Sequence, residues 1–207
     1  MTIAYDIKAD IVDIRFDKPK HQDSFFVDTN VWYWLTYSQA SVTAKSSQVR
    51  EYPNYFKKIR SANSRLLRCD LSLAELAHII ENTEYEIFCD ANKKNPVKYP
   101  KKEFRHSSAS GRNDVTQEIE SAWMQVQQFS SSIPIAIDDA AVTTFLTDLK
   151  TNKLDGYDLF YLDILRKNRL QILTDDGDFA TVPGITVFTA NLAVIDAART
   201  CGQLKMR

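Results

Sequence analysis

Acidic side chains follow apolar stretches at separated places in this sequence, and their positions could bring several carboxylates together. Asp28 comes directly after the apolar residues 25–27, and Asp176 and Asp178 come after a short apolar run that ends at Thr174. In open parallel sheets, ligands bind beyond the carboxyl ends of the strands. We therefore expect these carboxylates to meet at one edge of a sheet.

Two predicted helices extend the same acidic set. Asp158 opens one helix, and Glu75 lies in the first turn of another, where its carboxylate could point back toward that edge. Carboxylates gathered in this way repel one another, which costs stability unless a cation neutralises them. Hard oxygen ligands suit Mg²⁺ or Mn²⁺. The pattern therefore predicts a site for one or two of these ions.

Each of these acidic residues also has a plainer explanation. Asp28 is placed to cap the helix that follows it, and Asp158 and Glu75 are placed to stabilise the positive ends of their own helices. The stretch TDDGDF is typical of a polar turn. The joint recurrence of carboxylates in strand, helix, helix, strand order favours the metal site, because they are not all needed as caps.

The elements that must position these residues have the pattern of an α/β protein. Short apolar runs predict strands at residues 24–28, 133–137, 170–174 and 185–189. One predicted helix follows residue 28, and others cover residues 54–68, 72–88, 113–129, 138–150 and 157–168. Apolar strands without polar alternation favour a parallel sheet covered on both faces. We expect a three-layer α/β/α fold with a central, mostly parallel sheet.

Two segments lie outside this pattern. Residues 9–16 roughly alternate between apolar and polar types, which predicts an extra strand at an edge of the sheet. We interpret residues 1–23 as an N-terminal extension and residues 24–207 as a single domain. Lysine and proline replace apolar residues from about 91 to 112, which predicts a basic loop. This predicted basic loop belongs to a helical and loop insertion between about residues 45 and 111.

The composition excludes several classes of protein. The 207 residues, 44% of them hydrophobic, are enough for one sizeable core. The chain has 26 basic and 27 acidic residues, so any contact with nucleic acid must come from a local patch. Its three cysteines lie far apart, which fits neither a disulfide framework nor a structural zinc site. No apolar run is long enough to span a membrane, and we expect a cytoplasmic protein.

Together, the acidic motifs resemble those of the PIN-domain family, which includes toxin ribonucleases of the VapC type and RNA-processing nucleases. FFVDTNVW resembles the opening strand and aspartate motif of that family, and LSLAELAHII resembles its second motif, with Glu75 as the acidic residue. Residues 156–179 resemble its closing helix and strand, which end in a T-x-D-x-D-F pattern. The resemblance covers most of the chain from residue 24 to residue 189.

The resemblance implies an endoribonuclease that hydrolyses RNA phosphodiester bonds with Mg²⁺ or Mn²⁺. The implied catalytic residues and metal ligands are Asp28, Glu75, Asp158 and Asp176, with Asp178 as a further ligand. The implied supporting residues are Asn30, Ser72 and Thr174. The resemblance also implies three partners: an RNA substrate, a small antitoxin protein if the chain is the toxin of a toxin–antitoxin module, and a second copy of the chain in a homodimer.

The predicted basic loop offers candidate contacts for the RNA. Its cations alternate with aromatic residues, a combination that can bind phosphates and stack on bases. The candidates are Lys98, Lys101, Lys102, Arg105 and Arg112. A solvated loop explains the same composition equally well, because lysine-rich loops are common on protein surfaces.

Two other interpretations of the acidic set remain open. A phosphatase of the haloacid-dehalogenase type also starts from an aspartate after a parallel strand, but it needs a second aspartate where this chain has Asn30. A PIN-like scaffold that binds RNA or protein without turnover would have no need for mutually repelling carboxylates. The sequence leaves open the choices between a toxin and a housekeeping enzyme and between RNA and DNA.

Overall fold

The structure is a computed structural model that describes residues 5–107 and 109–207. Residues 1–4 of the predicted N-terminal extension and residue 108 of the predicted basic loop lie outside the described residues. The strands are β1 Asp10–Asp13, β2 Ser24–Val27, β3 Arg65–Arg68, β4 Ser131–Ser132, β5 Gln171–Leu173, β6 Thr186–Thr189 and β7 Leu204–Lys205. The helices are α1 Thr29–Thr36, α2 Gln48–Ser61, α3 Leu71–Ala91, α4 Lys101–Ser107, α5 Ala109–Phe129, α6 Asp139–Thr151, α7 Gly156–Asn168 and α8 Leu192–Cys201.

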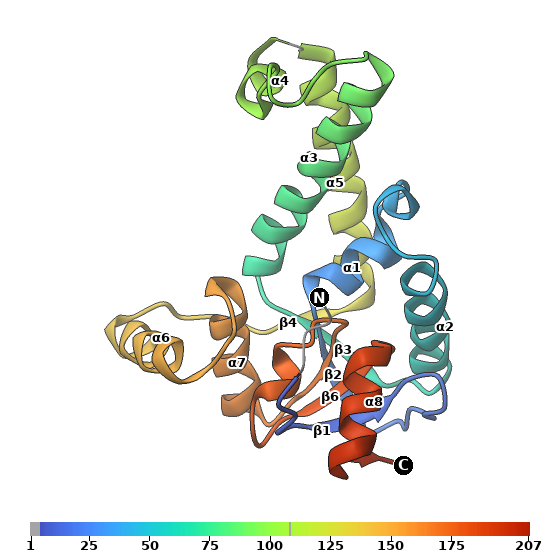
Figure 1. Ribbon diagram of the computed structural model, residues 1–207, viewed down its shortest axis with the longest axis vertical. Helices are drawn as coiled ribbons and strands as arrows, with labels where there is room; N and C mark the ends of the chain where they lie inside the picture. Colours follow the sequence, from blue (N-terminus) through green and yellow to red (C-terminus); the bar gives the residue numbers. More distant parts are fainter. Residues whose placement is uncertain (1–4, 108) are drawn as a thin grey trace.

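The described strands form one seven-stranded sheet in the order β4-β3-β2-β5-β6-β1-β7, and all of its paired strands are parallel. Helices lie on both sides of this sheet (Figure 1). The predicted α/β fold with a central parallel sheet is therefore confirmed.

Alternate residues of β2 belong to different cores. Phe25 lies on one face and packs edge-on against Tyr55 of α2, with 6.0 Å between the ring centroids. Phe26 lies on the other face, 5.2 Å from the ring of Tyr161 in α7. A strand buried on both faces must be apolar at every position. This explains the continuous apolar runs in the sequence.

The prediction of an edge strand at residues 9–16 is wrong. The strand β1 lies inside the sheet, between β6 and β7. Ile11 pairs with Leu204 of β7 on its outer side and with Val187 of β6 on its inner side. The C-terminal strand β7 has only two residues, so it leaves no clear pattern in the sequence, and its pairing covers β1.

Two further predicted elements are corrected by the structure. Residues 133–137 form no regular strand, because Pro134 has no N–H to donate and the ladder of β4 with β3 stops before it. Residues 54–68 do not form one helix. The helix α2 ends at Ser61, Asn63 adopts a left-handed φ of 53°, and the chain turns there into β3.

The segment predicted as a basic loop forms the tip of a protruding arm: residues 92–100 are turns and loop, and the residues from 101 to 107 form α4. The long helices α3 and α5 run side by side, and α4 lies at their far end (Figure 1). A small core of Cys89, Tyr99, Phe104 and Val115 holds the tip together. These few apolar residues are dispersed among lysines in the sequence, so the composition indicated a loop.

The remaining predicted helices are confirmed, with small changes at their ends. They correspond to α1, α3, α5, α6 and α7. Asp138 caps α6 through a hydrogen bond of 2.8 Å from the Ala141 N–H to its Oδ1. All three cysteines are free thiols. None of the helices in the described ranges is long and apolar enough to cross a membrane.

Candidate active site

Asp28 follows β2 directly and occupies the position before the first residue of α1. Its side chain makes no capping hydrogen bond to that helix. Instead, Asp28 Oδ2 accepts a hydrogen bond of 2.6 Å from the hydroxyl of Thr174, which follows the neighbouring strand β5. The carboxylate of Asp28 therefore does not act as the helix cap that its position suggests.

Glu75 joins the site from α3. Because α3 begins at Leu71, Glu75 lies in the second turn rather than in the predicted first turn. Its Oε2 accepts hydrogen bonds of 2.6 Å from Thr29 Oγ1 and from the Tyr161 hydroxyl. Two side chains from α1 and α7 thus hold this carboxylate in one orientation.

Thr29 and Tyr161 are not among the site residues predicted from the sequence. Both residues carried a usable signal, however. Thr29 is adjacent to Asp28 in the first motif, and Tyr161 lies three residues after Asp158. Residues three apart share one face of a helix, so a hydroxyl at position 161 was a candidate neighbour of the acidic set.

Asp158 comes from the first turn of α7 but is not the cap of that helix. Asp155 caps α7, because its Oδ1 accepts hydrogen bonds of 3.1 Å from the Tyr157 N–H and 3.3 Å from the Asp158 N–H. Asp158 is 7% exposed. No hydrogen bond to its carboxylate forms within residues 5–107 and 109–207. Burial, rather than hydrogen bonding, therefore sets the surroundings of this carboxyl group.

The three aspartates after β5 have different surroundings. The Asp176 N–H donates to Thr174 Oγ1 at 2.9 Å, and Asp176 Oδ1 accepts from the Asp178 N–H at 2.8 Å. Asp175 instead accepts hydrogen bonds of 2.7 Å from both Tyr52 and Gln48 of α2. Asp175 therefore anchors α2, and Asp176 belongs to the acidic cluster.

The carboxylates lie close enough to affect one another. Burial, with added repulsion from Glu75, raises the pKa of Asp28 to about 7, although the Thr174 hydroxyl opposes this effect. Burial and repulsion from Asp28 raise the pKa of Asp158 to about 9. Burial also raises the pKa of Asp176. The structure thus brings the four predicted catalytic carboxylates into one cluster, which we call the acidic cluster: Asp28, Glu75, Asp158 and Asp176.

The acidic cluster has the donor atoms and charge that a divalent cation needs. None of its members forms a salt bridge with a described residue, so its negative charge has no cationic partner within that part of the chain. As the side chains stand, the described residues contain no group of three or more His, Cys, Asp or Glu that could hold a metal ion. Buried carboxylate oxygens nevertheless fit Mg²⁺ or Mn²⁺ in donor type and charge.

The predicted supporting residues have different places in the structure. Thr174 contacts Asp28 directly. Ser72 is buried, and its hydroxyl lies 3.9 Å from Cys69 Sγ. Asn30 is half-buried in α1, and its side chain has no hydrogen-bond partner among the described residues. Asp178, the predicted further metal ligand, lies beside the cluster, and burial raises its pKa. Of the three supporting residues, only Thr174 holds a carboxylate of the cluster.

Tyr5 from the N-terminal extension lies against the loop that carries Asp176. A Cβ atom at Gly177 would overlap the end of the Tyr5 ring, so only glycine permits this close approach. Burial and the nearby charges of Asp178 and Asp176 raise the pKa of Tyr5. The sequence carried no signal for this contact, because it joins two segments far apart in the chain.

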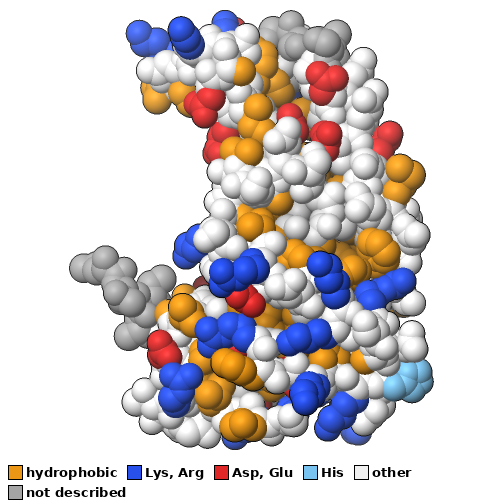
Figure 2. Space-filling view, turned by 90° about the vertical axis from the view of Figure 1, so that its right-hand side faces the viewer, with side chains coloured by type: hydrophobic (Ala, Val, Ile, Leu, Met, Phe, Trp, Pro, Cys, Tyr) orange, Lys and Arg blue, Asp and Glu red, His pale blue; other side chains and the backbone are white. Residues whose placement is uncertain are grey.

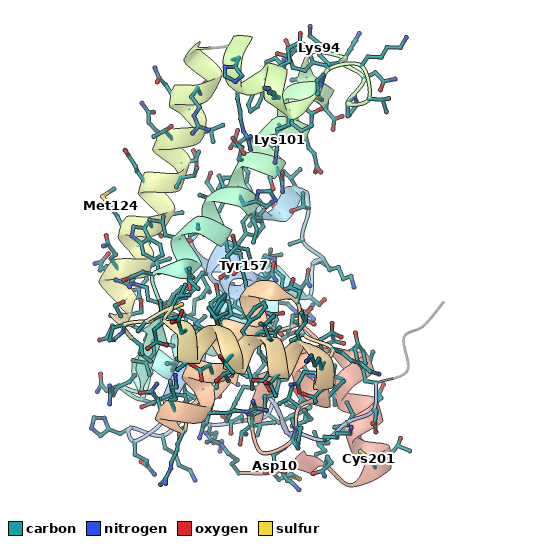
Figure 3. All side chains as sticks on the ribbon, turned by 90° about the vertical axis from the view of Figure 1, so that its left-hand side faces the viewer. Asp10, Lys94, Lys101, Met124, Tyr157 and Cys201 are labelled. Carbon is teal, nitrogen blue, oxygen red and sulfur yellow. The ribbon has the colours of Figure 1, made fainter. Side chains whose placement is uncertain are left out.

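The predicted RNA-contacting cations lie on the arm. Figure 3 shows Lys101 far up the arm from Tyr157, at the start of α7. Lys101, Arg105 and Arg112 all form ion pairs with Glu81, for example at 3.0 Å between Arg112 Nη1 and Glu81 Oε1. Lys98 and Lys102 are exposed. Most of these cations therefore help to hold the arm together, and a role in RNA binding stays a prediction.

No family model matches the sequence, and no curated protein matches it at a significant level. The function must therefore be inferred from the acidic cluster and its surroundings.

Proposed function

We propose that this chain is a metal-dependent endoribonuclease that hydrolyses RNA phosphodiester bonds at the acidic cluster. The observation that carries the proposal is that four carboxylates from four elements gather at one edge of a parallel sheet, with no cation in the described chain to neutralise them. Such an arrangement costs stability unless a ligand uses it. The resemblance of the motifs to the PIN-domain family supports the same activity.

The residues of the acidic cluster would have different roles in catalysis. Asp28, Asp158 and Asp176 would hold one or two Mg²⁺ or Mn²⁺ ions, with Asp178 as an additional ligand. A bound ion of this kind lowers the pKa of a water molecule and neutralises charge that develops on the phosphate. Thr174 positions both Asp28 and Asp176, because its hydroxyl donates to one and accepts from the other. Thr29 and Tyr161 orient Glu75, which would accept a hydrogen bond from the attacking water.

The proposed partners come from the resemblance of the motifs to the PIN-domain family. RNA is the proposed substrate. If the enzyme is the toxin of a toxin–antitoxin module, a small antitoxin protein and a second copy of the chain are further proposed partners. A cytoplasmic location belongs to the same proposal.

The test is cleavage of end-labelled single-stranded and structured RNA by the purified chain with Mg²⁺, Mn²⁺ or EDTA. We expect cleavage that needs the metal and that disappears in Asp28→Asn and Asp158→Asn. Asp163→Asn is the matched control, because Asp163 lies on the same helix as Asp158 but pairs with the exposed Lys167. This control should cleave like the unchanged chain. Full activity of Asp28→Asn would overturn the proposal.

Two additional substrates separate the alternatives. Hydrolysis of a simple phosphomonoester without cleavage of RNA would indicate a phosphatase. Cleavage of single-stranded DNA in preference to RNA would change the substrate class but not the site. Binding of Mn²⁺ without cleavage of any of these substrates would favour a scaffold that binds nucleic acid or protein.

A further inference from the structure

A cluster of exposed cations lies on α2, on the segment that precedes β2 and at the start of β3. Figure 2 shows Lys and Arg side chains gathered on the side of the molecule that carries α2. We call this surface the α2 basic face, and its exposed members are Lys18, Lys20, Lys57, Lys58 and Arg65. In a chain with a net charge of −1, such a surface is a local concentration of positive charge.

The α2 basic face is hollowed at its centre. A shallow, open depression of about 430 Å³ lies between α2 and the segment before β2, and it is lined by Lys18, Pro19, Lys57, Lys58, Ser61 and Ala62. Three lysine side chains thus line this depression. The lining contains no large apolar side chain, whereas the centres of protein–protein interfaces are enriched in aromatic residues and depleted in lysine.

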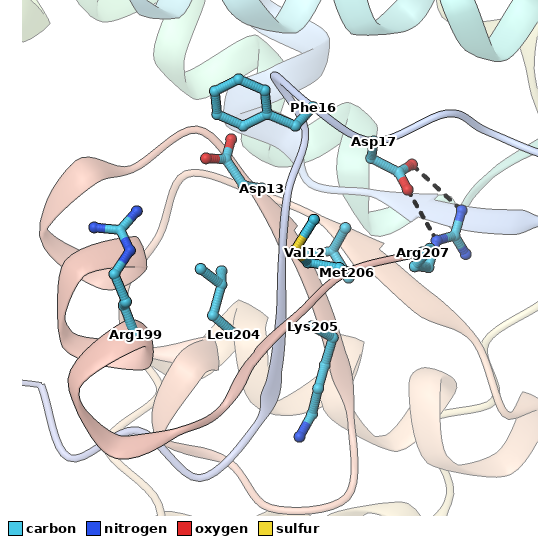
Figure 4. Close-up of a pocket in the computed structure, with 9 residues that line it drawn as sticks. All are labelled: Val12, Asp13, Phe16, Asp17, Arg199, Leu204, Lys205, Met206 and Arg207. Atoms are coloured by element: carbon cyan, nitrogen blue, oxygen red, sulfur yellow. Dashed lines mark hydrogen bonds and ion pairs between the residues drawn. The ribbon is translucent and has the colours of Figure 1, made fainter.

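Two acidic residues near the α2 basic face form salt bridges with Arg207. Arg207 binds Asp17, with 3.0 Å between Nε and Oδ1, and binds Asp23, with 2.6 Å between Nη2 and Oδ2. Figure 4 shows the contact of Arg207 with Asp17. Lys58 Nζ donates only to backbone carbonyls, the nearest being that of Arg15 at 3.2 Å. Within the described residues, no carboxylate forms a salt bridge with any member of the α2 basic face.

The helix α2 links this face to the acidic cluster. Gln48 at its start binds Asp175, the residue before Asp176. The helix rises by about 1.5 Å per residue, so Lys57 lies roughly 14 Å from Gln48 along the axis. A nucleic acid strand that binds the α2 basic face can therefore extend along the helix to the acidic cluster, but a very short oligonucleotide cannot reach both places.

We propose that the α2 basic face binds the phosphate backbone of the RNA substrate at a distance from the bond that is cleaved. This inference rests on the proposed function, and it adds a binding surface outside the acidic cluster. Lysine ammonium groups make phosphate contacts that do not depend on base sequence. The face therefore strengthens binding to long RNA of any sequence and leaves the chemical step unchanged.

The first test measures binding alone. Asp28→Asn protein in EDTA is titrated with fluorescent single-stranded RNA of about 20 nucleotides at several salt concentrations. We compare Lys18→Gln/Lys57→Gln with Lys150→Gln/Lys167→Gln, which removes the same charge from exposed positions on α6 and α7. Loss of two phosphate contacts should lower the slope of log K against log salt by about 1.4, since each contact contributes about 0.7 for single strands. The control slope should not change.

The second test measures cleavage and uses the length of the RNA. In the metal-loaded enzyme, Lys18→Gln/Lys57→Gln should raise KM for the RNA of about 20 nucleotides several-fold and leave kcat unchanged. For an RNA of about three nucleotides, which is too short to span α2, both constants should stay as they are. Equal changes for both lengths would overturn the inference.

The binding test can support the RNA-binding role of the α2 basic face even if the proposed nuclease activity fails. If the unchanged chain cleaves no RNA, the proposed function fails, whereas a reduced salt slope would still assign RNA binding to this face. Equal slopes of log K against log salt for Lys18→Gln/Lys57→Gln and Lys150→Gln/Lys167→Gln would overturn the inference. Stronger binding of polyglutamate than of RNA would also overturn it, because the partner would then be an acidic protein.

Discussion

The hydroxyl of Thr174 donates a hydrogen bond of 2.6 Å to Oδ2 of Asp28, and this bond joins the carboxyl ends of β5 and β2. Both side chains are almost completely buried. The bond fixes the orientation of the Asp28 carboxyl group. It also favours the ionised carboxylate, and thus opposes the rise in the pKa of Asp28 that burial causes.

Thr174→Val should therefore weaken both stability and activity. Valine has nearly the same shape but no hydroxyl, so Asp28 loses its donor and its pKa rises further. We expect a loss of about 2 kcal/mol in the free energy of unfolding, as is typical of a buried hydrogen bond to a charged group. Urea denaturation measures this loss. Thr174→Ser keeps the donor and is the control; a valine variant as stable as the serine variant would contradict the assigned role.

Tyr161→Phe should reduce cleavage more than stability. The change removes one of the two hydroxyls that hold Glu75 Oε2 and keeps the ring that packs against Phe26. We expect kcat to fall about tenfold and KM to change little, because the hydroxyl orients a group that acts in the chemical step. Tyr157→Phe, at an exposed position of the same helix, should leave both constants unchanged. A matching loss in that control would contradict a specific role for Tyr161.

Without metal, the stability of the protein should fall as the pH rises. The pKa of Asp28 rises from 3.8 to about 7 and that of Asp158 from 3.8 to about 9. A carboxyl with a raised pKa binds its proton more tightly in the folded state than in the unfolded state. Its stabilising effect is therefore present in full below about pH 4 and is lost as the pH rises through these values.

Thermal unfolding at several pH values checks this expectation. In EDTA, Tm should fall between about pH 5 and pH 9, apart from the effects of other groups, and Asp158→Asn should reduce the slope. Mn²⁺ should raise Tm more at about pH 8.5 than at about pH 6, because metal and protons compete for the same carboxylates. The same Tm increase with Mn²⁺ in Asp28→Asn/Asp158→Asn would show that the ion binds elsewhere.

Gly177→Ala should destabilise the protein only while Tyr5 is present. The added Cβ would overlap the end of the Tyr5 ring, so this ring must shift away from the acidic loop. We expect a cost of about 1 kcal/mol in the unchanged background and much less in Tyr5→Ala, which a double-mutant cycle measures. Additive effects of the two changes would show that the contact is absent in solution.

The sequence by itself determined the class of fold and the candidate carboxylates. Strands buried on both faces appear as continuous apolar runs, as in β2, β5 and β6, and helices such as α6 and α7 have local caps and apolar spacing. Asp28, Asp158 and Asp176 could be selected because they lie next to these elements. All of these signals come from residues that are close together in the chain.

The tertiary structure decided what depends on contacts between distant residues. It placed β1 inside the sheet by pairing it with β7, near the other end of the chain. It directed Asp175 toward α2 and Asp176 toward the acidic cluster, although the two residues are adjacent. It also brought Tyr5 to Gly177. Local sequence patterns do not specify contacts between distant residues, because these contacts depend on the packing of the whole chain.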